Sequence, residues 1–286
     1  MRFARLGRSF LGAGLLGAAG ALLICPAALG TSPTDPTQVP EELQGVGVEE
    51  KLGRTIDLDL TFIAEDGYPV ALREYFGKGR PVILNLVYYN CPMLCNLVLN
   101  GQTQTLREIP WTPGEEFEIV TISIDPTETF ALAQKKKAVY LAGYDRPAPG
   151  WHFLVDHQGN VKRLAEQLGF RYKYDENRGQ YAHAAVIMVL TEDGVVSRYL
   201  YGIRFKTRDV RLALTEASKG KVGTITDRVL LYCFHYDPDA KGYVLFAVNL
   251  MRAGGVAVML VLGGVLAMFW RRERRRAARG DWVVTQ

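Results

Sequence analysis

The fold is decided by the stretch PVILNLVYYNCPMLC, residues 81–95. Its first part, residues 81–88, is a short and almost wholly apolar run of the kind that forms a buried strand. Two cysteines follow, Cys91 and Cys95, with three residues between them. Positions i and i+4 of a helix share one face, so this spacing can direct both sulfurs at one soft metal ion or bring them together as a disulfide. The choice between metal binding and disulfide formation depends on the rest of the sequence.

The length and the first residues of the chain limit its class. The 286 residues are 48% hydrophobic with a net charge of +4, which accommodates one domain plus membrane-directed segments and gives no indication of nucleic-acid binding. Residues 1–30 combine a basic start with an apolar run, as in a secretory signal peptide, and Cys25 would then be removed with the signal. An uncleaved N-terminal anchor is the alternative, because the apolar run is long.

A second apolar segment lies near the other end of the chain. Residues 253–270 contain no charge, and as a helix they would span about 27 Å, close to the thickness of the hydrocarbon core. We therefore predict a transmembrane helix over residues 243–270, in which the first residues extend the run toward the membrane surface. Five of the next six residues are arginines, so the positive-inside rule places the tail, residues 271–286, in the cytoplasm.

This topology sets the compartment of the cysteines. With both basic ends on the cytoplasmic side, the intervening domain lies on the far side of the membrane, which in a bacterium with two membranes is the periplasm. The expected location is therefore the inner membrane, with a single C-terminal span. Because that compartment is oxidising, a disulfide between Cys91 and Cys95 is chemically accessible.

The central residues show the pattern of a mixed α/β domain. Residues 31–50 are expected to be a linker, residues 51–217 the folded domain, and residues 218–242 a connector to the membrane helix. Thr127 is the expected cap of the second helix. The expected strands are 56–62, 70–72, 81–88, 117–124, 184–190 and 195–201, and the expected helices are 94–107, 127–140, 160–168 and 207–217. This order predicts a thioredoxin-like α/β sandwich.

A site can be predicted on this fold. A helix that opens directly after a buried strand places Cys91 at its N-terminus, where a thiolate is favoured. Thioredoxin-type enzymes usually carry two residues between their cysteines, and the three found here suit a metal. Of the four histidines, His183 directly precedes the apolar strand at 184–190, where the fold brings a loop opposite the cysteines. Two thiolates and an imidazole suit Cu(I) and Cu(II) and, less exclusively, Zn.

These features resemble the Sco/SenC family, thioredoxin-like proteins that serve copper delivery to cytochrome c oxidase. The matching pieces are residues 86–95, the Ser-Ile-Asp-Pro segment at 123–126 and His183, and the resemblance spans roughly residues 52–217. Two features depart from the family pattern. Asn96 stands where many members have a second proline, and many members are anchored at the N-terminal end instead of the C-terminal end.

The resemblance implies a function and a ligand set. It implies that Cys91, Cys95 and His183 bind copper, that the two cysteines also form a reversible disulfide, and that the acceptor is the binuclear copper centre of cytochrome c oxidase. The expected function is a membrane-tethered copper metallochaperone. The alternative is a thiol-disulfide oxidoreductase that reduces the acceptor's cysteines, with Cys91 attacking and Cys95 resolving. A redox or copper sensor ranks last, because the short tail offers no output domain.

Other residues have competing interpretations. Cys233 and His235 would face the same way on an extended segment and would then form a second soft-metal site, the alternative being an aromatic membrane-interface belt with an incidental thiol. Asp125 is expected to be a cap or turn residue. Turn and surface positions are expected for His152 and His157. For the main site, the alternatives are a structural disulfide between Cys91 and Cys95 and a buried core role for His183.

Overall fold

The computed structural model describes residues 44–91, 94–219, 226, 231, 234–237, 239–245 and 247–278. The expected signal segment, residues 1–30, and Cys233 lie outside these residues.

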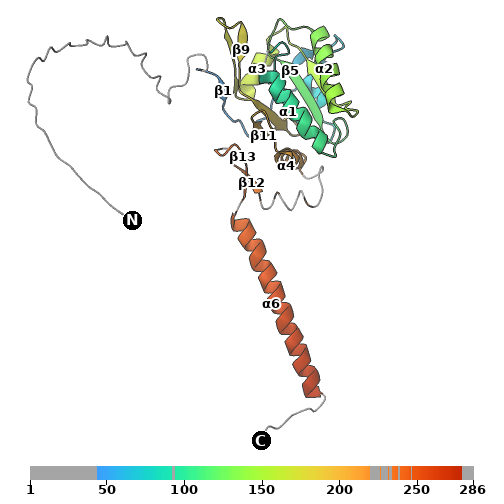
Figure 1. Cartoon of the computed structure of the whole chain (residues 1–286), viewed down its shortest axis with the longest axis vertical. Helices are drawn as coiled ribbons and strands as arrows, with labels where there is room; N and C mark the ends of the chain where they lie inside the picture. The colour runs from blue at the N-terminus through green and yellow to red at the C-terminus, as the bar shows by residue number, and fades with distance from the viewer. Residues whose placement is uncertain are drawn as a thin grey trace, which may run out of the picture. The chain divides into compact units, whose positions relative to one another are not determined.

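The domain is organised around a five-stranded sheet with the strand order β11-β10-β4-β5-β6 (Figure 1). The strands are β4 Val82–Val87, β5 Glu118–Ser123, β6 Trp151–Leu154, β10 Val186–Leu190 and β11 Val196–Tyr201. Strands β4, β5 and β6 run parallel, and β10 pairs antiparallel with both β4 and β11. Every residue of β4, β5 and β10 is buried. Strands β4 and β10 are almost wholly apolar, whereas β5 also buries Glu118, Thr121 and Ser123.

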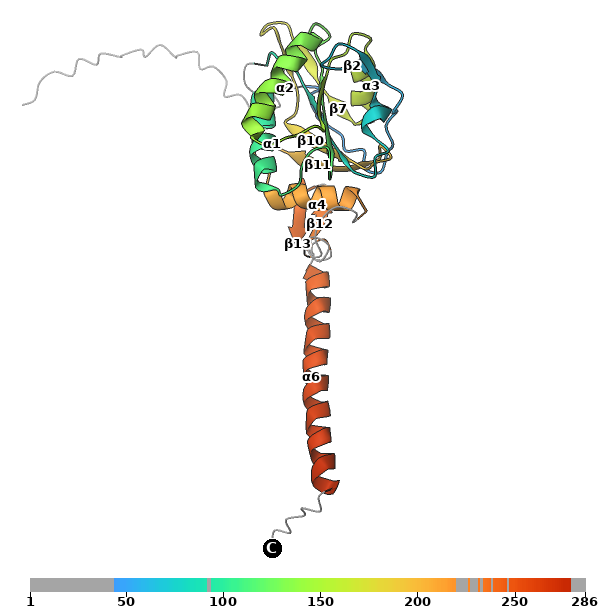
Figure 2. The same ribbon diagram turned by 90° about the vertical axis from the view of Figure 1, so that its right-hand side faces the viewer.

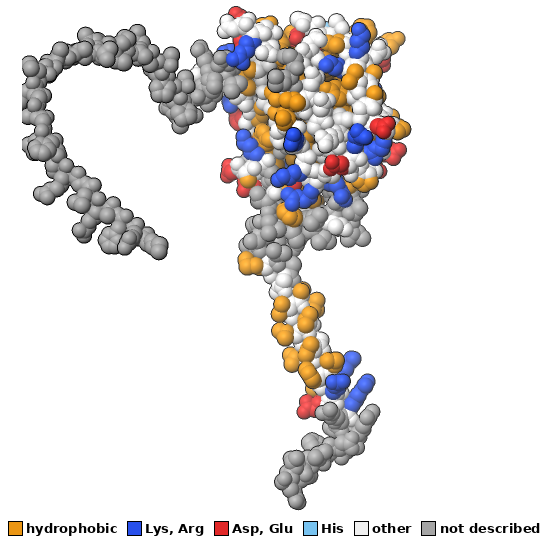
Figure 3. Space-filling view, viewed as in Figure 1, with side chains coloured by type: hydrophobic (Ala, Val, Ile, Leu, Met, Phe, Trp, Pro, Cys, Tyr) orange, Lys and Arg blue, Asp and Glu red, His pale blue; other side chains and the backbone are white. Residues whose placement is uncertain are grey.

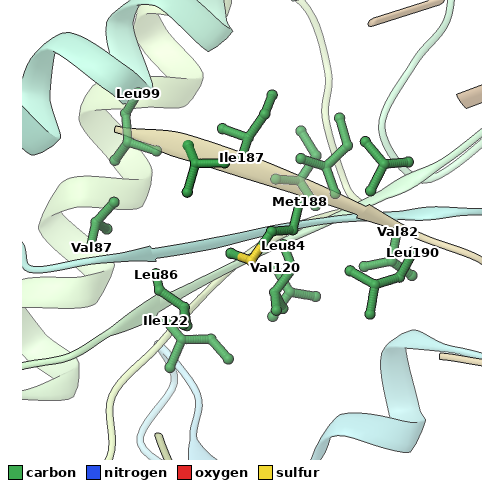
Figure 4. Close-up of a cluster of buried hydrophobic side chains, with 14 of the residues drawn as sticks. Val82, Leu84, Leu86, Val87, Leu99, Val120, Ile122, Ile187, Met188 and Leu190 are labelled. Carbon is green, nitrogen blue, oxygen red and sulfur yellow. The ribbon is translucent and has the colours of Figure 1, made fainter. Parts of the chain in front are cut away.

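Helices cover this sheet. They are α1 Leu94–Glu108, α2 Phe130–Tyr144, α3 Asn160–Gln167 and α4 Thr207–Ala217. Figure 2 shows α1 and α2 together on one side of the sheet and α3 on the other. Figure 4 shows the apolar side chains packed at the centre, among them Leu84 of β4, Val120 of β5 and Met188 of β10. Because β4 is buried on both faces, its position in the sheet is held, and this determines where α1 begins after it.

Smaller two-stranded units surround the main sheet. They are β1 Gly47–Val48 with β7 Phe170–Arg171, β2 Thr61–Ile63 with β3 Pro69–Ala71, β8 Lys173–Asp175 with β9 Gln180–Ala182, and β12 Phe234–Asp237 with β13 Gly242–Leu245. A 3₁₀ turn, η2 Leu72–Tyr75, follows β3. Strand β1 lies inside the segment expected to be a linker, so regular structure begins before residue 51.

The predicted sandwich is confirmed, with corrections to several elements. Helix α4 has the predicted bounds. The cap of α2 is Thr129, whose hydroxyl accepts the N–H of Leu132 at 3.4 Å, and not Thr127. Strand β6 occupies a stretch expected to be turn and surface.

The start of the C-terminal helix also differs from the prediction, because Gly242–Leu245 is strand β13. The reason is the polar end of Tyr243: this ring is buried, and its hydroxyl donates to Glu216 Oε2 at 2.8 Å. Helix α6 therefore begins at Ala247 and ends at Ala278. Within it, Gly254–Arg275 is the one helical stretch of the described residues that is long and apolar enough to cross a membrane. Figure 3 shows its apolar surface ending in a group of basic side chains.

Candidate metal-binding site

The two cysteines sit where β4 passes into α1. The Cys91 N–H donates to Tyr88 O at 3.4 Å, and the Cys95 N–H donates to Cys91 Sγ at 3.2 Å. The sulfur of Cys91 therefore lies at the N-terminus of α1, as predicted. Both residues are buried, with 5% of Cys91 and 1% of Cys95 exposed. The two sulfurs are not joined in a disulfide.

His183 comes from a distant part of the sequence and contacts Cys95. It lies between β9 and β10, and its Nε2 is 2.8 Å from Cys95 Sγ. Its Nδ1 is 2.9 Å from Ala184 O, and a carbonyl can only accept, so Nδ1 carries the proton. The lone pair of Nε2 is then directed at the sulfur of Cys95. A neutral imidazole with Nε2 free of its own proton is the form that ligates a metal.

Aromatic rings enclose the imidazole. The ring of Tyr88 lies edge-on to His183 at 6.1 Å between centroids, and the ring of Phe170 lies at 6.0 Å. Tyr181, two residues before His183, is 5.7 Å from Tyr88. This enclosure leaves only 6% of His183 exposed.

The two thiols have opposite proton affinities. A hydrogen bond from the Cys95 thiol lowers the pKa of Cys91 to about 3, with help from His183 and from the Cys95 N–H, against the opposing effect of burial. Burial, followed by the hydrogen bond to Cys91, raises the pKa of Cys95. At neutral pH the pair therefore holds one thiolate, on Cys91, and one thiol, on Cys95.

The structure brings the three predicted ligands together without presetting them around a common centre. Among the described residues, no three His, Cys, Asp or Glu side chains are already arranged to hold a metal ion. Instead, Cys95 keeps its proton in a hydrogen bond to Cys91, which is one of the groups that would coordinate the metal. The donor set itself, two sulfurs and one imidazole nitrogen, fits a soft metal ion such as copper once that proton leaves.

The other histidines lie elsewhere. His152 is half-buried in β6, where its Nε2 is 3.4 Å from Glu118 Oε2 and its ring lies 4.4 Å from that of Tyr75, so the expected turn or surface position was wrong. The cause is the length of β6, whose four residues are too few for a recognisable strand pattern. His157 is exposed, as expected, with Nδ1 3.0 Å from Pro126 O.

The remaining predicted residues have simple outcomes. Asp125 is a turn residue, as expected: its Oδ1 accepts the N–H of Thr127 at 2.8 Å and the Thr127 hydroxyl at 2.7 Å. Of the predicted second metal site, Cys233 lies outside the described residues, and the structure describes only the backbone of His235, in β12.

Two residues near the cysteines were not predicted to contribute. Asn96 Nδ2 donates to Cys91 O at 2.9 Å, while its Oδ1 accepts from Lys136 Nζ at 3.3 Å and from the Tyr140 hydroxyl at 3.2 Å. The carboxylate of Glu128 contacts the turn ahead of Cys91. The sequence signal for Asn96 was its replacement of a proline, whereas Glu128 gave no local signal.

The fold and the site can be compared with known proteins. The comparison with curated proteins gave no match. A putative electron transfer protein from Aquifex aeolicus VF5 is 24% identical with a TM-score of 0.54, over 60% of this chain and 96% of that one. A putative electron transport protein from the same organism is 21% identical with a TM-score of 0.50, over 60% of this chain and 100% of that one. These two similarities concern the fold.

A third solved structure and a family model also match this chain. ScoI from Bradyrhizobium japonicum with copper bound is 19% identical with a TM-score of 0.44, over 59% of this chain and 98% of that one. The family model SCO1/SenC matches residues 49–214, more than half of the chain. The chain belongs to the SCO1/SenC family.

Proposed function

We propose that this chain is a membrane-tethered copper metallochaperone that binds copper through Cys91, Cys95 and His183 and delivers it to the binuclear copper centre of cytochrome c oxidase. The observation that carries the proposal is the meeting of two thiols and one imidazole at the N-terminus of α1, within a SCO1/SenC domain. Copper is here the cargo. Thiolate and imidazole are the donors that copper prefers among protein side chains.

The protonation of the site supports uptake of a soft cation. Cys91 is already a thiolate at neutral pH, so it offers a charged ligand at once. Cys95 has to lose its proton, and His183 Nε2 lies 2.8 Å from the Cys95 sulfur as the third donor. Copper binding therefore releases about one proton per ion at neutral pH. Three ligands leave a coordination position open for a donor from the acceptor protein.

The proposed topology brings the cargo to a membrane-bound acceptor. Residues 1–30 are a signal segment, a linker follows it, and the copper-binding domain, which includes β1 at Gly47–Val48 and extends to residue 217, lies on the periplasmic side. Residues 218–242 connect this domain to the single membrane helix within 243–270, and residues 271–286 lie in the cytoplasm. Helix α6 supplies a stretch that is long enough for this span. Tethering raises the effective concentration of the domain near an acceptor in the same membrane.

A second function is favoured by the low pKa of Cys91. As a reductase, the Cys91 thiolate would attack one sulfur of the acceptor's disulfide and form a mixed disulfide, releasing the other sulfur as a thiolate. Cys95, after losing its proton, would attack Cys91 Sγ, release the acceptor's second thiolate and leave a Cys91–Cys95 disulfide. The acceptor gains the two electrons that the chain loses. The reduced cysteines of the acceptor are then able to bind copper.

Anaerobic Cu(I) titration of the full-length chain in detergent micelles, against a competing chelator, tests the main proposal. We expect Cys91→Ser, Cys95→Ser and His183→Ala each to weaken binding strongly. His157→Ala is the matched control, because His157 is exposed and contacts only the Pro126 carbonyl through its ring. An affinity that survives all three changes would overturn the ligand assignment. Disulfide exchange that persists in His183→Ala while copper binding is lost would separate the two functions.

A further inference from the structure

A buried carboxylate grips the turn that leads into Cys91. Glu128 lies between β5 and α2 and is 2% exposed. Its Oε2 accepts the N–H of Tyr89 at 2.7 Å, and its Oε1 accepts the N–H of Asn90 at 2.6 Å. The hydroxyl of Ser123 donates to Oε2 at 2.6 Å. Both oxygens of this carboxylate are therefore directed at the two residues immediately before Cys91 or at the strand beneath them.

Burying the carboxylate of Glu128 costs free energy, which its hydrogen bonds have to offset. Burial raises the pKa of Glu128, and the hydrogen bonds from Ser123, Tyr89 and Asn90 oppose that rise. Asn90 is exposed, so its N–H could bind water instead, whereas Tyr89 is 1% exposed and its buried N–H needs a protein acceptor. Hydrogen bonds to a charged acceptor are shorter and stronger than those to water or to a neutral group. What Glu128 adds is a fixed direction for two consecutive peptide groups.

The backbone of Cys91 is thereby held on both sides. Glu128 fixes the peptide groups that precede it, and Asn96 of α1 donates to the Cys91 carbonyl at 2.9 Å. The Tyr89 side chain adds an anchor, because its hydroxyl lies 2.7 Å from Leu154 O. The backbone around Cys91 is thus connected to β6 through Tyr89, to α1 through Asn96 and, through Glu128 and Ser123, to β5. The position of its sulfur relative to Cys95 then depends on side-chain rotation within a fixed frame.

We propose that Glu128 is a positioning residue, which holds the Tyr89–Asn90 backbone so that Cys91 Sγ stays within reach of Cys95 and His183. The inference deepens the proposed function and rests on Cys91, Cys95 and His183 being the working site. Copper ligation and disulfide formation both draw the two sulfurs together. A turn that is already held loses less conformational entropy in either reaction. Both reactions should therefore weaken when the carboxylate is removed.

The first test is Glu128→Gln in the full-length chain in detergent micelles. Glutamine keeps the shape but presents an NH₂ group to one of the two backbone N–H donors, so one buried N–H loses its acceptor. We expect the equilibrium constant for the Cys91–Cys95 disulfide against glutathione to fall about tenfold, which corresponds to about 30 mV. Cu(I) affinity should fall by about 10- to 100-fold, as for other groups that orient metal ligands.

The matched control is Glu118→Gln. Glu118 is a buried carboxylate at the opposite end of β5, 1% exposed and paired with Arg80 and Lys78. This change should lower the urea midpoint of unfolding but leave the disulfide constant and the copper affinity within about twofold of the wild type. Ser123→Ala, which removes a single donor to Glu128, should shift both constants in the same direction as Glu128→Gln by a smaller factor.

Three results would overturn the inference. One is a folded Glu128→Gln protein with wild-type constants. Another is an equal shift in Glu118→Gln, which would mean that general destabilisation is responsible. The third applies if Glu128→Gln does not fold: wild-type constants in Ser123→Ala would then count against positioning. A wild-type chain that binds no copper would refute the proposed function alone, because the disulfide equilibrium still decides the role of Glu128.

Discussion

The two ends of strand β5 each carry a buried carboxylate, and the two are used in opposite ways. At the N-terminal end, Glu118 Oε1 is 2.6 Å from Arg80 Nη2 and 3.5 Å from Lys78 Nζ. At the C-terminal end, beyond Ser123, the carboxylate of Glu128 accepts backbone N–H groups and a hydroxyl. One carboxylate is neutralised by cations, whereas the other directs the peptide groups of a turn.

This difference follows from position in the fold. Parallel strands place their carboxyl ends at one edge of the sheet, and there the chain leaves β4 and enters α1 through the cysteine turn. Cationic side chains paired with a carboxylate at that edge would add positive charge beside the site that we propose binds copper. At the other edge, ion pairing has no such cost, and it fixes the start of β4 against β5. If the proposed function holds, Glu118 contributes to stability and Glu128 to the geometry of the ligands.

The largest expected effect concerns the reactivity of Cys91. Because its pKa is about 3, Cys91 is a thiolate throughout pH 5 to 8, whereas a thiol with an ordinary pKa of about 8.5 gains about 1,000-fold in thiolate over that range. Alkylation by iodoacetamide, followed by mass spectrometry of the Cys91 peptide, should therefore proceed at a nearly constant rate. In Cys95→Ala the rate should become pH-dependent, because the hydrogen bond that lowers the pKa is lost. A tenfold change per pH unit in the wild type would contradict the assignment.

The second expected effect is that copper affinity depends on residues at the carboxyl edge of the sheet and not on those at the other edge. Removing a ligand with His183→Ala should weaken Cu(I) binding by more than about 100-fold, above the range of changes that act through orientation. His152→Ala removes an imidazole at the Glu118 end, where its Nε2 lies 3.4 Å from Glu118 Oε2, and should leave the affinity unchanged. Competition titration with a Cu(I) chelator measures both. Equal losses in the two variants would remove the distinction between the two edges.

The third expected effect is on stability at the opposite edge. Glu118→Ala leaves Arg80 and Lys78 without their buried partner and should lower the free energy of unfolding by about 2 to 3 kcal/mol. This is less than for a fully buried pair, because the side chains of Arg80 and Lys78 are 23% and 39% exposed. Urea denaturation followed by circular dichroism gives the value. If copper affinity fell as well, Glu118 would also support the site.

Local patterns in the sequence predicted much of this architecture. The apolar run of β4, the cysteine spacing and the amphipathic helix α4 carry their signals within a few residues, and the structure agrees with each. His183 was located through its place before an apolar strand, and the structure puts it 2.8 Å from Cys95. Its ligand role stays a prediction until copper binding is measured.

Features that depend on distant partners were missed. Glu128 reaches residues 38 and 39 positions away, so no periodicity reveals it. Strand β13 was assigned to the membrane helix because its apolar residues continue the hydrophobic run. Its pairing with β12 and the hydrogen bond from Tyr243 to Glu216, 27 positions away, separate it from the helix. Hydropathy measures what a segment can bury. It does not identify the surface against which that segment packs.

The smallest expected effect concerns the second support of the cysteine turn. Asn96→Ala removes the donor to the Cys91 carbonyl and should weaken Cu(I) binding by about fivefold, equivalent to about 1 kcal/mol for one hydrogen bond. Lys136→Ala is the control, because Lys136 contacts only the far oxygen of the same amide, at 3.3 Å, and should change the affinity by less than about twofold. A loss in Asn96→Ala as large as in Glu128→Gln would mean that the two supports act as one unit, since removing either would then release the turn completely.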